Sequence, residues 1–203
     1  MISQLKSFSL AGAALLLAGC VSRGPLPTLY DFGPPAPVAA SNQAAPALPA
    51  LVIADASGPS WLDSQRMYYR LLYADAQQSR PYAQNHWNTA PLQLLSQRLK
   101  SRVAQSGVKV LSTTDAAAGI PLLRIEVEDF SQNFDSQTRS SGQVTLRASL
   151  FRGHRLIDQK TFSRNQAAAS ADAQGGARAL ATASDAISAD ILAWLAVLPI
   201  PKE

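Results

Sequence analysis

The residue with the clearest chemistry in this sequence is Cys20, the only cysteine of the chain. It follows Leu17-Ala18-Gly19, which fits the bacterial lipobox, where the cysteine thiol is alkylated with diacylglycerol and the chain is then cut before it. The thiol is a strong nucleophile once ionised, and the small Ala18 and Gly19 let an extended chain enter a peptidase. We therefore predict cleavage between Gly19 and Cys20, with a diacylglycerol and an N-acyl chain on Cys20.

The segment before Cys20 has the composition of a secretory signal. Lys6 lies in a short basic region, and an apolar run follows from Phe8 to Ala18. A helix needs about 20 apolar residues to span a bilayer, so this run is too short for a permanent anchor. The lipid on Cys20 is the expected membrane anchor, with the mature chain facing the periplasm. Because Val21 and Ser22 follow the cysteine instead of an aspartate, we expect delivery to the outer membrane.

Side chains that could support catalysis or metal binding are few and scattered. The two histidines, His86 and His154, have no second ligand at metal spacing. Glu126 and Glu128 share one face of a predicted strand and could act as acid and base, but alternating charge opposite an apolar face is typical of the solvated side of a sheet. The sequence has no nucleophile elbow and no phosphate-binding glycine loop. We expect no enzyme activity, no catalytic residues, and no metal or other cofactor.

An aromatic and arginine-rich strand is predicted from Gln65 to Tyr73. The residues expected to face the core are Met67, Tyr69, Leu71 and Tyr73. The residues expected on the opposite face are Arg66, Tyr68, Arg70 and Leu72. Aromatic and arginine side chains together are typical of protein-binding hot spots, so this second set is our candidate partner-binding surface. The alternative is that the last helix covers that face, and its tyrosines only fill the core.

Length, cysteine count and net charge limit the domain organisation and the partners that this chain can have. The 203 residues allow one domain and a linker, and a single cysteine used for lipid leaves none for a disulfide. The net charge is only +4 without a basic run, so nucleic acid is not an expected partner. Seven prolines between Val21 and Ala50 predict an extended linker that holds the domain off the membrane. A short edge strand at Thr28–Phe32 is predicted to interrupt it and dock on the domain.

The domain itself is predicted to alternate strands and helices. Beyond the Gln65–Tyr73 strand, strands are expected at Leu51–Ala54, Arg80–Trp87, Val108–Leu111, Leu123–Phe134 (with a bulge), Val144–Leu150 and Leu156–Phe162, the last three as a meander. A hairpin turn is expected at Asp75–Ser79. One helix begins at Pro91, capped by Asn88 or Thr89, with a stripe of Leu92, Leu95, Leu99 and Val103. Trp87 and Pro91 have expected structural roles, with Trp87 wedged between helix and sheet. An alanine-rich helix from Asp172 to Leu198 closes the domain.

The predicted fold class is therefore α/β (α+β). It is a single domain in which a mixed or antiparallel sheet is packed by two main helices. The expected order is a signal peptide at 1–19, the lipidated cysteine and linker at 20–50, the domain at 51–198 and a tail at 199–203.

Three motifs carry a resemblance to a known family: Leu29-Tyr30-Asp31-Phe32, Arg66-x-x-Tyr69-Arg70, and Trp87-x-x-x-Pro91 before a leucine-striped helix. With the lipobox, they resemble the ABC-type transport auxiliary lipoproteins, a group that includes the paraquat-inducible C lipoproteins. The resemblance implies an α/β periplasmic lipoprotein that works with an ABC permease complex and a mammalian-cell-entry (MCE) protein to move lipids between two membranes. It supplies no catalytic residues.

Other functions stay open at this point. An outer-membrane lipoprotein that scaffolds or activates cell-wall synthesis has a similar plan, and direct lipid carriage in an internal cavity is a third hypothesis. A homo-oligomer is also compatible with the sequence. Genes for an MCE protein and an ABC permease beside this one favour the first function, and a penicillin-binding partner favours the second.

Overall fold

The computed structural model describes residues 26–35, 48–115 and 118–199. The predicted lipobox, with Gly19 and Cys20, lies outside these ranges. The described elements in chain order are β1 (Thr28–Tyr30), β2 (Ala50–Ile53), the 3-10 helix η1 (Ser60–Asp63), β3 (Arg66–Leu71), β4 (Asp75–Trp87), α2 (Pro91–Gln105), β5 (Lys109–Leu111), β6 (Leu122–Ser136), β7 (Arg139–Arg152), β8 (Arg155–Ala167) and α3 (Ala173–Val197).

The eight strands form one open mixed sheet, which confirms the predicted α+β class. β6, β7 and β8 make a long antiparallel meander. Two strands pair in parallel with the other edge of β6. β2 pairs with the first residues of β6, and β3 pairs with residues near its end. β4 and then β1 extend the sheet beyond β3, and β5 extends it beyond β2. β1 is thus an edge strand, as predicted.

A bulge in β6 decides which of its side chains reach the core. Leu123, Ile125 and Val127 are buried in the first half of the strand. A register shift against β7 between Val127 and Asp129 changes the alternation, so that Phe130 takes the next core position. The predicted meander and its bulge are confirmed.

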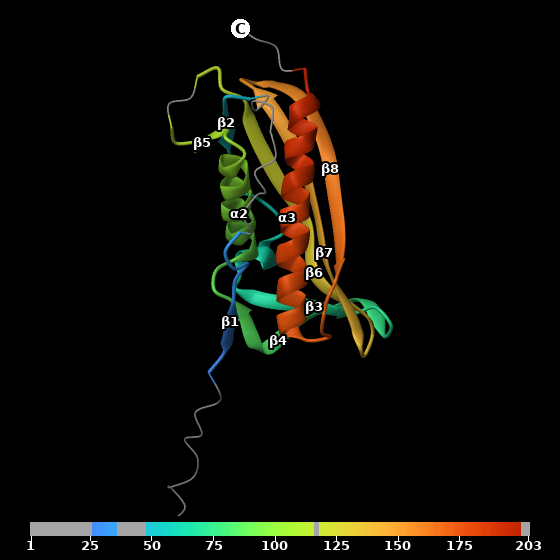
Figure 1. The fold of residues 1–203 in the computed structure, drawn as a ribbon. Coiled ribbons are helices and arrows are strands. Elements are labelled where there is room, and N and C mark those ends of the chain that lie inside the picture. Colours follow the sequence, from blue (N-terminus) through green and yellow to red (C-terminus); the bar gives the residue numbers. More distant parts are fainter. Residues whose placement is uncertain (1–25, 36–47, 116–117, 200–203) are drawn as a thin grey trace, which may run out of the picture.

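α2 and α3 lie side by side on one face of the sheet (Figure 1). α3 packs on β7 and β8, and its Leu180, Ile187 and Ile191 are buried there. By length and composition alone α3 could cross a membrane, but 44% of its apolar window is buried inside the domain. Those contacts identify it as the core helix of the fold.

α2 has the predicted apolar stripe but a different N-terminus. Leu92, Leu95, Leu99 and Val103 are all buried. Neither Asn88 nor Thr89 is the N-cap: that position is Ala90, which makes no side-chain cap hydrogen bond, and Pro91 begins the helix. Proline at the first helical position removes one of the unpaired N–H groups of the first turn, and its fixed φ suits the start of a helix.

The β3–β4 hairpin differs from the prediction. The chain turns at residues 72–74, and Asp75–Ser79, predicted as the turn, already belong to β4. The pairing of β3 with β4 shifts register between Arg70 and Leu71, and a polar sequence gives no local signal for such a shift. Tyr73, predicted to face the core, lies in the turn and is 47% exposed.

A buried polar network fixes the start of α3 against the sheet. Gln132 on β6 is 1% exposed, and its amide donates to Ser140 Oγ at 2.8 Å and to the Asp172 carbonyl at 3.0 Å. Tyr82 Oη donates to Gln132 Oε1 at 2.9 Å, and burial raises the pKa of this phenol. A Cβ at Gly176 would lie 2.0 Å from Gln132 Oε1, so only glycine leaves room for the network.

The N-terminal segment Thr28–Pro35, which we call the strap, is fastened to the domain. β1 pairs with the end of β4, and the backbone N–H of Asn88 donates to the Tyr30 carbonyl at 2.8 Å. Phe32, beyond the strand, packs against the core. The strap shortens the part of the linker that separates the domain from Cys20, in contrast to the spacer role expected for the whole of Val21–Ala50.

Candidate functional site

The four predicted partner-binding residues lie along β3 and its turn. Arg66 is exposed, and Leu72, in the turn, is 40% exposed. Tyr68 is half-buried, because its ring packs edge-on against Trp61 of η1, with 5.4 Å between centroids. The strand therefore presents an aromatic and arginine-bearing surface, but Tyr68 already has an aromatic neighbour within the chain.

Arg70 is held by its own hairpin. Its Nη1 donates to the carbonyls of Ala76 and Gln77 at 3.4 and 3.5 Å, in the part of β4 where the register shifts. Its positive charge also acts on Asp129 of β6, which accepts from the Ser131 hydroxyl at 2.9 Å. Burial still raises the pKa of Asp129, because desolvation outweighs both of these favourable contacts.

The opposite side of β3 belongs to the interior. Met67 is 2% exposed. The ring of Tyr69 packs on Tyr82 and on Phe134, with centroid separations of 4.6 and 5.7 Å. β3 thus has two unlike faces.

Trp87 and Pro91 lie at the junction of sheet, strap and α2. Trp87 is 1% exposed and contacts the rings of Phe32 and Phe130, with centroid separations of 5.8 and 5.7 Å. Pro91 is buried at the first position of α2. A tryptophan from β4, a phenylalanine from the strap and one from β6 therefore form a single aromatic cluster.

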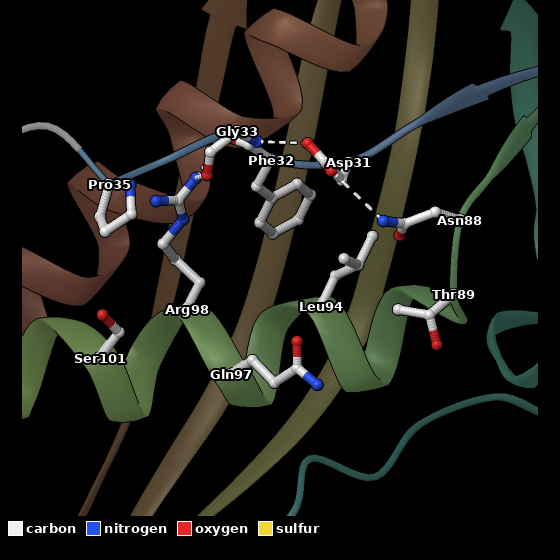
Figure 2. A pocket seen from close by; sticks show the side chains of 10 residues that line it. All are labelled: Asp31, Phe32, Gly33, Pro35, Asn88, Thr89, Leu94, Gln97, Arg98 and Ser101. Atoms are coloured by element: carbon white, nitrogen blue, oxygen red, sulfur yellow. Dashed lines mark hydrogen bonds between the residues drawn. The ribbon is translucent and has the colours of Figure 1, made fainter.

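Figure 2 shows the strap crossing above α2, with Arg98 reaching up to it. Asp31 shapes the strap by accepting from the Gly33 backbone N–H at 2.7 Å and from Asn88 Nδ2 at 3.3 Å. Gly33 has a φ of 63°, which glycine adopts without strain. This turn presents the carbonyls of Phe32 and Gly33 to α2.

Arg98 of α2 binds the strap through its guanidinium group. Its side chain is 5% exposed, and Nη2 donates to the Phe32 carbonyl and, at 2.9 Å, to that of Gly33. Its guanidinium also lies 5.6 Å from the centre of the Phe32 ring. The same group pairs through Nε with Asp185 of α3 at 3.4 Å. One buried cation therefore joins strap, α2 and α3.

The carboxylate of Asp185 forms ion pairs with both Arg98 and Arg102. Arg102 Nη2 lies 2.7 Å from Asp185, and this hydrogen-bonded pairing raises the pKa of Arg102. The pKa of Arg98 is lowered by burial, although the Asp185 carboxylate partly opposes that effect. Arginine remains charged even so, because its ordinary pKa is far above neutrality.

Two open cavities flank the strap. One of about 290 Å³ lies on the α2 side, between Phe32, Leu94 and Arg98. The other, of about 750 Å³, lies on the α3 side, between Tyr30, Gln174 and Arg178. Both have mixed polar and apolar walls, and the described residues that line them include no paired nucleophile and base. Their geometry suits the binding of an extended segment or a partner surface more than a chemical reaction.

The two glutamates that could act as acid and base are held in ion pairs on the surface of the sheet. Glu126 and Glu128 both pair with Arg147 on the polar face of the sheet. Within the described ranges, no three His, Cys, Asp or Glu side chains come together as a metal site. The sequence reasoning missed Arg98, although an arginine between Leu95 and Leu99 on an apolar helix stripe was a readable signal for a buried cation.

The chain matches the sequence model of a family described as the ABC-type transport auxiliary lipoprotein component, over residues 30–192. Nothing among curated proteins matches. The match begins at the last residue of β1 and ends in the last turns of α3, so it includes most of the strap, the rest of the sheet, α2 and most of α3.

Two solved structures are similar to this fold. A crystal structure of a protein from Xanthomonas campestris superposes with a TM-score of 0.65 at 20% identity, covering 73% of this chain and 84% of its own. A crystal structure of an uncharacterized protein gives a TM-score of 0.64 at 16% identity, covering 84% of this chain and 99% of its own. At such identities the likeness establishes the fold.

Proposed function

We propose that this chain, which belongs to the ABC-type transport auxiliary lipoprotein family, is a non-enzymatic accessory component of an ABC/MCE-type system that moves lipids between two membranes. The carrying observation is the family match, which spans the domain from β1 into α3. The described residues around the strap cavities form no catalytic grouping, which fits a role through protein–protein contacts. Its partners are an MCE-domain protein and an ABC permease complex.

The lipid on Cys20 anchors the protein, and the residues after it direct it to the outer membrane. Support comes from the lipobox for the anchor, and from Val21 and Ser22 in place of an aspartate after the cysteine for the outer membrane. The domain then faces the periplasm, where a complex based in the inner membrane can reach it.

Arg66, Tyr68 and Arg70 on β3 are the proposed contact surface for the protein partner. Arg66 is exposed, and the aromatic pair Tyr68–Trp61 lies beside it. Arginine and aromatic side chains at a rigid strand are suited to a binding hot spot.

The test is capture of partners by the full lipidated chain, purified from membranes in mild detergent after cross-linking. We expect an MCE-domain protein and ABC permease subunits, at reduced yield with Arg66→Ala. Arg155→Ala, an exposed arginine on β8, is the matched control and is expected to keep the yield. A penicillin-binding protein in place of these partners would support cell-wall scaffolding and overturn the proposal.

A further inference from the structure

We propose that the end of the domain that carries the start of β1 and the β3–β4 turn rests on a phospholipid surface through exposed apolar side chains. The surface is that of the membrane holding the lipid on Cys20, so the inference rests on the proposed anchor. Leu72 is then a membrane contact and not a partner-binding residue.

The tether is too short to let this end move far from the bilayer. Leu26, at the start of the described chain, is the sixth residue after Cys20. At the maximum reach of a fully extended chain, six residues span about 20 Å. The strap itself is fixed to β4 and to the aromatic cluster, so its residues cannot lengthen the tether. The start of β1 therefore stays within that distance of the lipid.

Figure 1 shows which part of the molecule shares this end. The start of β1, the β3–β4 hairpin and the β6–β7 turn lie toward the lower end, whereas the C-terminal end of α3 and the β7–β8 turn lie at the upper end. A domain tethered at the start of β1 thus directs its lower end to the membrane. Its upper end points into the periplasm.

Four of the six exposed large apolar side chains among the described residues lie at this end, and the other two, Leu156 and Val197, lie at the upper end. Leu26 is 90% exposed and Leu29, on β1, is 60% exposed. In the β3–β4 turn, Leu72 and Tyr73 are 40% and 47% exposed. A tyrosine suits the boundary between lipid and water, because its ring is apolar and its hydroxyl remains hydrated.

The charges at this end are close to balanced. Arg70, Arg80 and Arg139 are opposed by Asp75 and Asp135 on the β3–β4 hairpin and around the β6–β7 turn, which leaves a net charge of only +1 there. A balanced surface gains little from anionic lipids, which attract clustered basic residues. The contact should therefore depend on apolar side chains at the headgroup level and be insensitive to lipid charge.

The test compares two engineered cysteines in the full lipidated chain. Lipid occupies Cys20, so Tyr73→Cys or Leu156→Cys supplies the one free thiol for a fluorescent label. Leu156, on β8 at the upper end, is 46% exposed and is the matched control. Each labelled protein is reconstituted into phosphatidylethanolamine–phosphatidylglycerol vesicles that contain headgroup-nitroxide lipid. We expect loss of fluorescence at position 73 and none at position 156.

The pattern of quenching at the two positions decides the proposal. Loss at position 73 that persists when phosphatidylcholine replaces phosphatidylglycerol supports it. Equal quenching at both positions, none at position 73, or quenching that requires phosphatidylglycerol overturns it while leaving the transport role intact. Mass spectrometry of the same samples checks the lipid on Cys20, and an unlipidated chain overturns both the anchor and this surface. Thermal melts of both variants establish that the labelled proteins are folded.

Discussion

At the scale of single residues, Trp87 shows what the junction of strap, sheet and α2 contributes. It is 1% exposed and contacts Phe32 and Phe130. Trp87→Ala should lower the free energy of unfolding by about 3–5 kcal/mol, the usual cost of removing a large buried aromatic. Urea denaturation of the soluble domain measures this loss.

The controls for Trp87 are two residues of the candidate partner surface. Tyr68 is only half-buried, and Arg70 bonds its own hairpin at long distances. Tyr68→Ala and Arg70→Ala should therefore cost clearly less than Trp87→Ala. If both unfold the domain as badly, β3 is core on both of its faces and the proposed partner surface is wrong.

A pH dependence is expected from the cap of α3. Asp172 accepts from the Gly175 backbone N–H at 2.7 Å and from the Ser170 hydroxyl at 2.8 Å, which lowers the pKa of its carboxyl. With a depressed native pKa, this stabilisation is present above the unfolded value, about 3.9, and is lost as pH falls through the native value. Asp172→Ala should cost about 0.5–2 kcal/mol at neutral pH, as for other N-caps.

The measurement is a series of thermal melts between neutral and acidic pH. Asp172→Ala should lose part of the acid sensitivity of the native chain. Asp129→Asn is an informative comparison, because burial raises the pKa of Asp129 and its protonation favours the native state as pH falls. An Asp172→Ala profile that runs parallel to that of the native chain would contradict the role of this cap.

At the scale of elements, the attachment of the strap to the domain depends on two side chains, Phe32 and Arg98. Phe32 joins the aromatic cluster, and Arg98 binds the two carbonyls beside it while pairing with Asp185. Removing this cation takes the donor away from two part-buried carbonyls and removes its packing on Phe32, whereas Asp185 keeps Arg102. The strap should therefore detach before the rest of the domain unfolds.

Arg98→Met is expected to cost about 2–4 kcal/mol, below the full cost of breaking a buried pair because Arg102 still neutralises Asp185. It should also expose the strap to limited proteolysis. Lys100→Met is the matched control on α2, because Lys100 pairs with the exposed Asp55 and should contribute under about 1 kcal/mol. Equal protection of the strap in both variants would show that Arg98 does not hold it.

The elements that sequence reasoning predicted well are those with long, regular patterns. The alternation in β6 and β7 and the helical spacing of Leu180, Ile187 and Ile191 reflect burial against one continuous core. The turn at residues 72–74 was misplaced because it contains neither glycine nor proline and the register shift lies in the polar residues after it. Local chemistry gives no signal where long-range pairing sets the turn.

The candidate site was only partly readable from sequence for a related reason. Apolar alternation at Tyr30 and Phe32 predicted a docked edge strand, and the structure confirms β1. The strap is held by hydrogen bonds from Arg98 to two backbone carbonyls. Every residue has a backbone carbonyl, so the sequence does not show which two will accept from this arginine. Side-chain identity can flag a buried arginine, but only the fold shows what it binds.

At the scale of the whole molecule, one cysteine is expected to decide where the protein resides. Cys20→Ala should abolish lipidation and signal cleavage, leaving a longer precursor. Membrane fractionation and mass spectrometry of the N-terminus check this, with Ser22→Ala as a control that should remain lipidated. An unmodified mature N-terminus at another residue would rule out the anchor.

The parallel pairing of β1 with β4 has a mechanical consequence for an anchored protein. A pull on Cys20 reaches the domain at the start of β1 and loads the strand along its length. The β1–β4 hydrogen bonds run across that direction, so they share the load and must break together, whereas a peeling force breaks them singly. Behind the strand, Phe32 is lodged against Trp87 and Arg98 holds its carbonyl, so the strap acts as a stop. A partner that pulls on the domain against its lipid anchor would therefore have to break these contacts together before the strap could leave the fold.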